Sequence, residues 1–75
     1  MTIHLCDAEI NKSYKISKIL GDNFALKRRL MELGFIAGRD VCIVRKSLIK
    51  KTVLVQIEGY LLSLRCQVAN MIVVK

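Results

Sequence analysis

Hydrophobic and polar residues alternate in several short runs along this chain, and a period of two predicts β-strands. We expect five strands, at residues 14–20, 41–46, 52–58, 60–65 and 71–74. The second and third should pair as a hairpin through the connection 47–51. In the first strand the alternation slips at Lys18, which indicates a β-bulge.

The pattern changes to a helical period once, over about residues 24–33, where leucines recur at i, i+4 and i+7. The leucines that should face the sheet are Leu26, Leu30 and Leu33. Asp22 or Asn23 can supply the side-chain oxygen that caps the start of this helix. Residues 5–10 and 66–70 are each long enough for one further helical turn.

Glycines mark the places where the chain must turn sharply. Gly34 stands directly after the helix, where a residue with positive φ is expected, and Gly38 precedes the next strand. Gly59 turns the chain between the last two long strands. Short strands with one helix, too few for a two-sheet sandwich, predict a mainly β, small, partly open barrel that forms a single domain over residues 1–75.

Length and hydropathy limit the class of protein. A chain of 75 residues buries only about 60% of the surface that its unfolded form exposes, so its core is thin. No apolar run approaches the roughly 18 residues of a membrane-spanning helix. The first residues lack the basic and apolar regions of a secretory signal. We therefore expect a cytoplasmic protein.

Candidate chemistry is sparse. Three cysteines, Cys6, Cys42 and Cys66, form no C-x-x-C pair and are expected to be reduced, with Cys42 packed in or beside the core. His4 and Cys6 would share one face of an extended strand, but two ligands do not complete a metal site. We predict no catalytic residues, no metal site and no cofactor, so the protein should not be an enzyme. Weak binding of a transition metal ion by His4 or the cysteines stays open.

Charge adds a prediction about partners. Thirteen Lys and Arg against six Asp and Glu give a net charge of +7 and imply an acidic partner. Nucleic acid, an anionic membrane surface and an acidic patch on a protein all remain open. The basic residues cluster, notably at 27–29 on the helix and on both sides of the connection 47–51.

The spacing of apolar residues and glycines resembles that of the FeoA family over nearly the whole chain. The residues that carry the resemblance are Arg29, Leu30, Leu33, Gly34, Phe35, Gly38, Val41, Val53, Val55, Gly59, Ser63, Leu64, Arg65, Ala69, Ile72 and Val74. The family commonly has glycine, often after proline, where this chain has Asn11, and there is no proline here. Asn tolerates positive φ, so the turn should survive.

The resemblance implies an SH3-like barrel and an accessory or regulatory role in ferrous iron uptake. It also implies a partner, FeoB, a membrane transporter with a cytosolic GTPase region. The alternative is a basic small-barrel nucleic-acid-binding protein. We consider nucleic acid the weaker candidate, because single-strand binders stack bases on several aromatics and only Tyr14, Phe24, Phe35 and Tyr60 are present.

The hairpin connection is the first candidate for a partner-binding surface. Leu48 and Ile49 stand where polar turn residues are usual, and the flanking cations are Arg45, Lys46, Lys50 and Lys51. Such a segment suits an acidic protein groove or the anionic inner face of a membrane. Alternatively, the two apolar side chains fold back and plug one end of the barrel. The second candidate surface comprises Lys27, Arg28 and Arg29 on the helix.

Overall fold

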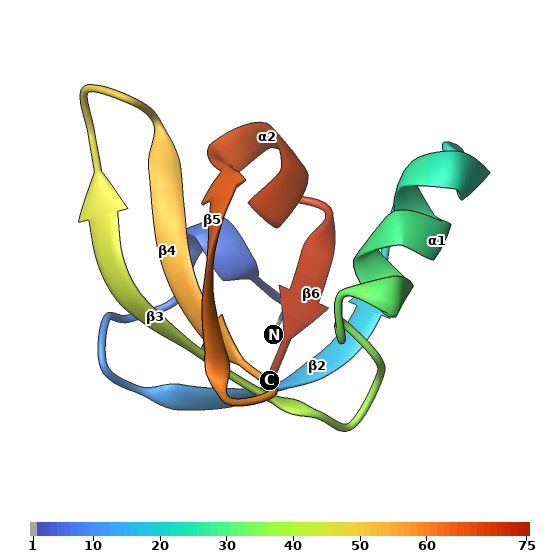
Figure 1. The fold of residues 1–75 in the computed structure, drawn as a ribbon, viewed down its shortest axis with the longest axis horizontal. Helices are drawn as coiled ribbons and strands as arrows, with labels where there is room; N and C mark the ends of the chain where they lie inside the picture. The colour runs from blue at the N-terminus through green and yellow to red at the C-terminus, as the bar shows by residue number, and fades with distance from the viewer. Residues whose placement is uncertain (1) are drawn as a thin grey trace.

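The computed structural model describes residues 2–75. Within them, six strands form one antiparallel sheet in the order β1-β6-β2-β3-β4-β5 (Figure 1). The strands are β1 (Ile3–His4), β2 (Ser13–Ile19), β3 (Asp40–Ser47), β4 (Thr52–Ile57), β5 (Tyr60–Arg65) and β6 (Ile72–Val74). The helical elements are α1 (Phe24–Glu32), α2 (Cys66–Ala69) and a 3-10 turn (Leu5–Asp7).

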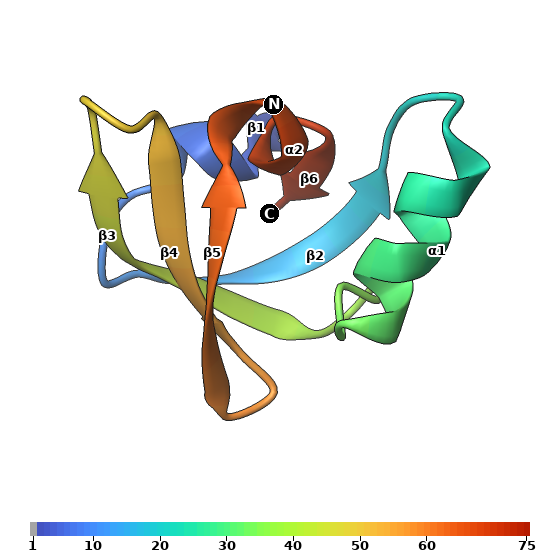
Figure 2. The ribbon, with the colours of Figure 1, turned by 45° about the horizontal axis from the view of Figure 1, so that its top comes forward.

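Strand β2 connects the two halves of the sheet. Its first residues, Ser13–Lys15, pair with β3, and from Ile16 onward it pairs with β6 on its other side. The register shifts between Ile16 and Lys18, so the predicted bulge is confirmed. A bulge bends its strand and increases the local twist. The sheet therefore curls into the mainly β, partly open barrel that the sequence predicted, with α1 beside its open part (Figure 2).

The alternating side chains of the long strands fill the interior. In β3 and β4 the inward residues Val41, Ile43, Val53 and Val55 are almost completely buried, whereas their neighbours along the strand are half-buried or exposed. Leu30 from α1 packs into this core, and Leu26 and Leu33 pack against its edge. The predicted leucine stripe is thus the buried face of the helix.

Helix α1 begins at a side-chain cap. Of the two candidates, Asn23 is the N-cap, and its Oδ1 accepts a hydrogen bond of 3.1 Å from the backbone N–H of Leu26. This bond satisfies one of the N–H groups that lack a partner in the first helical turn.

The same helix ends in a Schellman motif. The N–H of Phe35 donates to the carbonyl of Leu30 and the N–H of Gly34 donates to that of Met31, each over 3.0 Å. Gly34 has φ +111°, which confirms the predicted turn. Phe35 and Leu30 are both buried, as the apolar contact of this motif requires. The chain thereby passes from helix to β3 with a fixed geometry.

Other turns also follow the sequence. Gly38 and Gly59 have φ +90° and +81°, and Asn11 has φ +65°, so the expected turn at Asn11 forms. Glu58 and Gly59, both with positive φ, join β4 and β5 in a two-residue hairpin in which Ile57 pairs with Tyr60. Positive φ at both central residues is the signature of a type I′ turn, whose twist matches that of the flanking strands.

Two details of the prediction were wrong. The sheet has six strands instead of five, because Ile3 and His4 pair with Val74 and Val73 of β6, a partner distant in sequence. His4 and Cys6 do not share a strand face, since the chain enters the 3-10 turn at Leu5. His4 Nδ1 instead donates to the carbonyl oxygen of Asn70 over 2.7 Å.

Candidate partner-binding surfaces

The β3–β4 hairpin ends in an apolar tip. Leu48 is 91% exposed and Ile49 is 95% exposed. The turn that carries them is ordered by a hydrogen bond of 3.2 Å from the N–H of Lys50 to Ser47 Oγ. The two side chains therefore do not plug the barrel, and that alternative is wrong.

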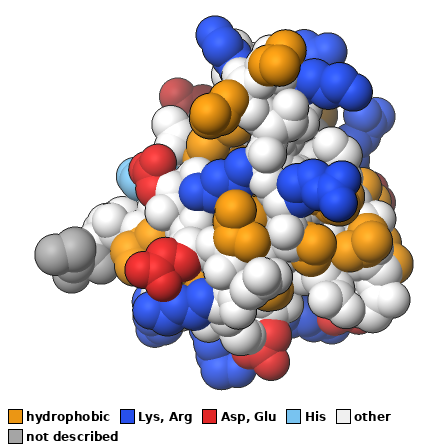
Figure 3. Space-filling model, turned by 90° about the vertical axis from the view of Figure 1, so that its left-hand side faces the viewer, with side chains coloured by type: hydrophobic (Ala, Val, Ile, Leu, Met, Phe, Trp, Pro, Cys, Tyr) orange, Lys and Arg blue, Asp and Glu red, His pale blue; other side chains and the backbone are white. Residues whose placement is uncertain are grey.

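Basic side chains surround this tip. No acidic residue occurs between Val41 and Ile57, and the two ion pairs found within residues 2–75, Lys15–Asp40 and Arg39–Glu58, lie elsewhere. Figure 3 faces this side and shows apolar and basic side chains mixed toward its top. We call this the tip surface; it comprises Arg45, Lys46, Leu48, Ile49, Lys50 and Lys51.

A second surface lies beside helix α1. Strand β2 pairs with β3 over Ser13–Lys15, and Ile16 exchanges backbone hydrogen bonds with Gly38 and Arg39 just before β3. Beyond Ile16, β2 borders helix α1. The result is a groove of about 530 Å³, which we call the helix groove. Its lining residues are Ile16, Ser17, Lys18, Ile19, Phe24, Lys27, Arg28, Met31, Phe35 and Ala37. The lining contains three basic residues and no acidic one.

The helix groove contains exposed apolar side chains. Phe24 is 80% exposed and Met31 is 49% exposed, on the side of α1 that does not enter the core. Lys27 Nζ lies 6.0 Å from the centre of the Phe24 ring, a cation–π distance. Exposed aromatics and methionine beside cations are typical of protein-binding surfaces.

The predicted helix cations are not all brought together. Lys27 and Arg28 line the helix groove, whereas Arg29 lines two other depressions, one of which it shares with Phe24 and Arg28. Phe24 and Met31 were not among the residues predicted to bind a partner. The sequence does contain a signal for them. Phe24 and Met31 are seven residues apart, with Lys27 and Arg28 between them, so they form a second stripe along the helix next to the buried leucine stripe.

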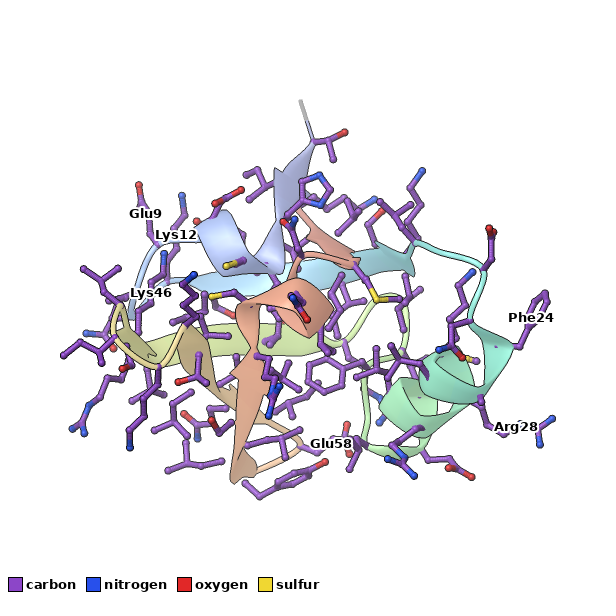
Figure 4. All side chains as sticks on the ribbon, turned by 90° about the horizontal axis from the view of Figure 1, so that it is seen from above. Glu9, Lys12, Phe24, Arg28, Lys46 and Glu58 are labelled. Atoms are coloured by element: carbon purple, nitrogen blue, oxygen red, sulfur yellow. The ribbon has the colours of Figure 1, made fainter. Side chains whose placement is uncertain are left out.

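The two surfaces lie at opposite ends of the molecule. The β3–β4 hairpin and α1 are widely separated in both ribbon views (Figures 1 and 2). Figure 4 shows Phe24 and Arg28 pointing outward from α1, at the end away from Lys46 of β3. One partner can therefore occupy the helix groove while the tip surface stays free.

Similarity to known proteins identifies the family of this chain. The FeoA domain model matches residues 3–75. The chain belongs to the FeoA family. No curated protein matches it.

Solved structures agree with the family model. A FeoA-like protein from Clostridium acetobutylicum has a TM-score of 0.85 at 28% identity, with 99% of this chain and 85% of that chain covered. FeoA of Stenotrophomonas maltophilia, determined in complex with zinc, has a TM-score of 0.82 at 33% identity, covering 100% and 89%. That protein is described as a prokaryotic SH3 domain protein and a candidate activating factor of ferrous iron transport.

The fold also occurs inside a larger protein. T. acidophilum IdeR has a TM-score of 0.82 at 23% identity, and the match covers 99% of this chain but only 33% of that one. This likeness concerns the fold alone. Membership of the FeoA family associates this chain with the SH3-like barrel fold and with ferrous iron transport.

The cysteines of this FeoA domain are half-buried. Burial and a hydrogen bond with the thiol of Cys66 raise the pKa of Cys6 from 9.0 to about 11. Since the thiolate is the nucleophile, Cys6 is a poor nucleophile at neutral pH. No group of three or more His, Cys, Asp or Glu side chains that could hold a metal ion occurs in residues 2–75.

Proposed function

We propose that this FeoA domain is a non-enzymatic, cytoplasmic accessory protein of ferrous iron uptake that binds the cytosolic portion of a FeoB-type transporter and adjusts its activity or assembly. The observation that supports this most is the helix groove, in which Phe24 and Met31 remain exposed between Lys18, Lys27 and Arg28. Exposed apolar side chains that are grouped in a groove and rimmed by polar residues mark interaction sites.

The groove defines the chemistry of the partner. Its apolar floor would receive one or two large apolar side chains, and its basic rim would pair with Asp or Glu beside them. The segment that binds should therefore be apolar in the middle and acidic at its flanks. Steering by the +7 charge would speed association with such a segment and would weaken with added salt.

No helix among residues 2–75 is long and apolar enough to cross a membrane. The proposal accordingly places the contact on a part of the transporter that projects into the cytoplasm. It assigns no catalytic residue to this domain, which acts by occupying a surface of the transporter.

Nucleic-acid binding is the second candidate, favoured by the +7 charge. Tyr14 and Phe35 are buried, which leaves Phe24 and Tyr60 as the exposed aromatic side chains of residues 2–75. Two rings are few for a base-stacking platform. Titration against labelled DNA and RNA at two salt concentrations tests this candidate, because phosphate-driven binding weakens steeply as salt rises.

The proposed partner is tested by pull-down. Tagged domain is incubated with detergent-solubilised membranes from cells that contain the FeoB-type transporter and from cells that lack it. We expect the transporter to be retained by the wild-type domain and largely lost by Phe24→Ser with Met31→Ser. A wild-type domain that retains no transporter, under conditions where the transporter is intact, would refute the proposal.

A further inference from the structure

We propose that the β3–β4 hairpin is a membrane-contacting loop that inserts Leu48 and Ile49 into an anionic lipid leaflet. The tip surface is separate from the helix groove, so this inference does not depend on the transporter. Its occupant is a lipid surface that carries negative headgroups.

The apolar part of the argument rests on position. Leu48 and Ile49 are adjacent and almost completely exposed at the end of a hairpin that projects from one corner of the barrel (Figures 1 and 2). Turn tips usually carry Gly, Asn, Asp, Ser or Pro, since water solvates them. Two large aliphatic side chains held outward by an ordered turn form a small convex wedge. A wedge of this kind can enter the boundary between headgroups and acyl chains.

The charges of the tip surface complement an anionic leaflet. Four cations lie within three residues of the apolar pair, and no acidic residue occurs between Val41 and Ile57. Arg65 adds a fifth cation, because it lines one depression together with Lys50 and Lys51. Long basic side chains can keep their charge among the headgroups while aliphatic neighbours go deeper.

Other partners fit this surface less well. A stable protein interface buries about 800 Å² on each partner around a packed centre, and two side chains on a convex tip cannot supply that. Single-stranded nucleic acid is held by aromatic stacking, and the tip surface has no aromatic residue. A bilayer, in contrast, accepts a small wedge without a matching pocket.

Contact of this size would be weak and reversible. Even one myristoyl chain gives only marginal membrane binding, and the tip buries less apolar surface than that chain does. Its use would be to concentrate the domain at the membrane. The molecule measures 28 × 27 × 24 Å. With the tip in the leaflet, the whole domain, including the helix groove, would therefore lie within about 30 Å of the bilayer.

Insertion can be observed directly, because the protein contains no tryptophan. Ile49→Trp places a single reporter at the tip, and Phe24→Trp places a matched exposed reporter at the other end. Each protein is mixed with vesicles of phosphatidylglycerol and phosphatidylcholine, or of phosphatidylcholine alone. We expect a blue shift of the Ile49→Trp emission with the anionic vesicles only, and no shift for Phe24→Trp.

Sedimentation with the same vesicles measures how much the apolar pair and the lysines each contribute to vesicle binding, in variants that carry no tryptophan. Leu48→Ser with Ile49→Ser should weaken binding at least tenfold. Lys50→Gln with Lys51→Gln should weaken it about 25-fold, since each basic residue at an anionic surface strengthens binding about fivefold. The matched charge control, Lys27→Gln with Arg28→Gln, should have less than a threefold effect. All four replaced tip side chains are exposed, so the thermal midpoints should match the wild type.

The inference would be overturned by absence of vesicle binding by the wild type, by equal losses for the tip and helix charge variants, or by an unshifted Ile49→Trp emission in bound protein. Loss of transporter or nucleic-acid binding in the tip variants, without loss of vesicle binding, would also overturn it and assign the hairpin to that macromolecule.

Discussion

The hydroxyl of Tyr60 donates a hydrogen bond to the backbone carbonyl of Leu33 at the end of helix α1. This carbonyl is among those that lack a partner within the helix. A second contact lies close by, where Arg39 pairs with Glu58 over 2.5 Å. The first contact ties β5 to the end of helix α1, and the second ties the β4–β5 turn to the loop that leads into β3. Both connect the β4–β5 hairpin to the segment that carries the chain from α1 to β3.

Removing the Tyr60 hydroxyl tests this link. Tyr60→Phe should lower the free energy of unfolding by about 0.5–1 kcal/mol, because the ring is retained and one partly exposed hydrogen bond is lost. Urea unfolding measures the change. Ser63→Ala, which removes an exposed hydroxyl from the same strand, should change stability little. Equal stability of Tyr60→Phe and the wild type would contradict a structural role for this bond.

Gly34 and Gly59 make a matched pair for a second prediction. Both have positive φ, but a Cβ on Gly34 would lie 2.7 Å from Cγ of Glu58, whereas a Cβ on Gly59 would meet nothing within 4 Å. Gly59→Ala should cost about 1 kcal/mol through backbone strain alone. Gly34→Ala should cost more, because Glu58 must also move away from Arg39.

The additional cost in stability of Gly34→Ala over Gly59→Ala can be measured separately. In the background Glu58→Ala, which removes the contacting Cγ, the cost of Gly34→Ala should fall to that of Gly59→Ala. A thermodynamic cycle over Gly34→Ala and Glu58→Ala measures this coupling by urea unfolding. The steric argument fails if the cycle shows no coupling or if the two glycine variants cost the same.

Much of the fold could be predicted because its signals are local. The alternation of β3 and β4, the leucine stripe of α1 and the glycine at its C-terminus each specify an element within a few residues of sequence. The bulge at Lys18 was predictable for the same reason, since the alternation itself slips there. The sequence also shows that Leu48 and Ile49 are unusual residues for a turn, but it left open whether they are exposed or plug the barrel.

The features that could not be predicted depend on contacts between residues far apart in the sequence. Strand β1 exists because of β6, and nothing near Ile3 indicates that pairing. The helix groove depends on where β2 and β3 separate and on how Leu26, Leu30 and Leu33 pack α1 against the core. Phe24 and Met31 could be placed on one stripe in advance. That this stripe lines a groove became visible only in the assembled fold.

The thiol of Cys6 gives a prediction about pH. Burial and the neighbouring Cys66 thiol raise the Cys6 pKa to about 11 in the folded protein, against 9.0 ordinarily. Between pH 9 and pH 11 the Cys6 thiol is largely deprotonated in the unfolded chain but still protonated in the folded one. The contribution of Cys6 to stability is therefore complete below pH 9 and is lost as the pH rises toward 11.

A comparison with Cys6→Ser isolates this effect from other groups that titrate at high pH. The stability advantage of the wild type over Cys6→Ser, measured by urea unfolding, should be smaller at pH 10.5 than at pH 8. The alkylation rate of Cys6 by iodoacetamide should likewise keep rising above pH 9, because only the thiolate reacts. A constant stability difference and a rate that levels off near pH 9 would show that the thiol is not perturbed.

Binding of a transporter through the helix groove is tested most directly by titrating the purified cytosolic portion of the FeoB-type transporter with three forms of the domain. These are the wild type, Phe24→Ser with Met31→Ser, and Leu48→Ser with Ile49→Ser, each checked for an unchanged fold. We predict saturable binding by the wild type, at least tenfold weaker binding by the groove variant, and less than a twofold change for the tip variant. No binding by the wild type, or equal affinities of the wild type and the groove variant, would contradict this assignment.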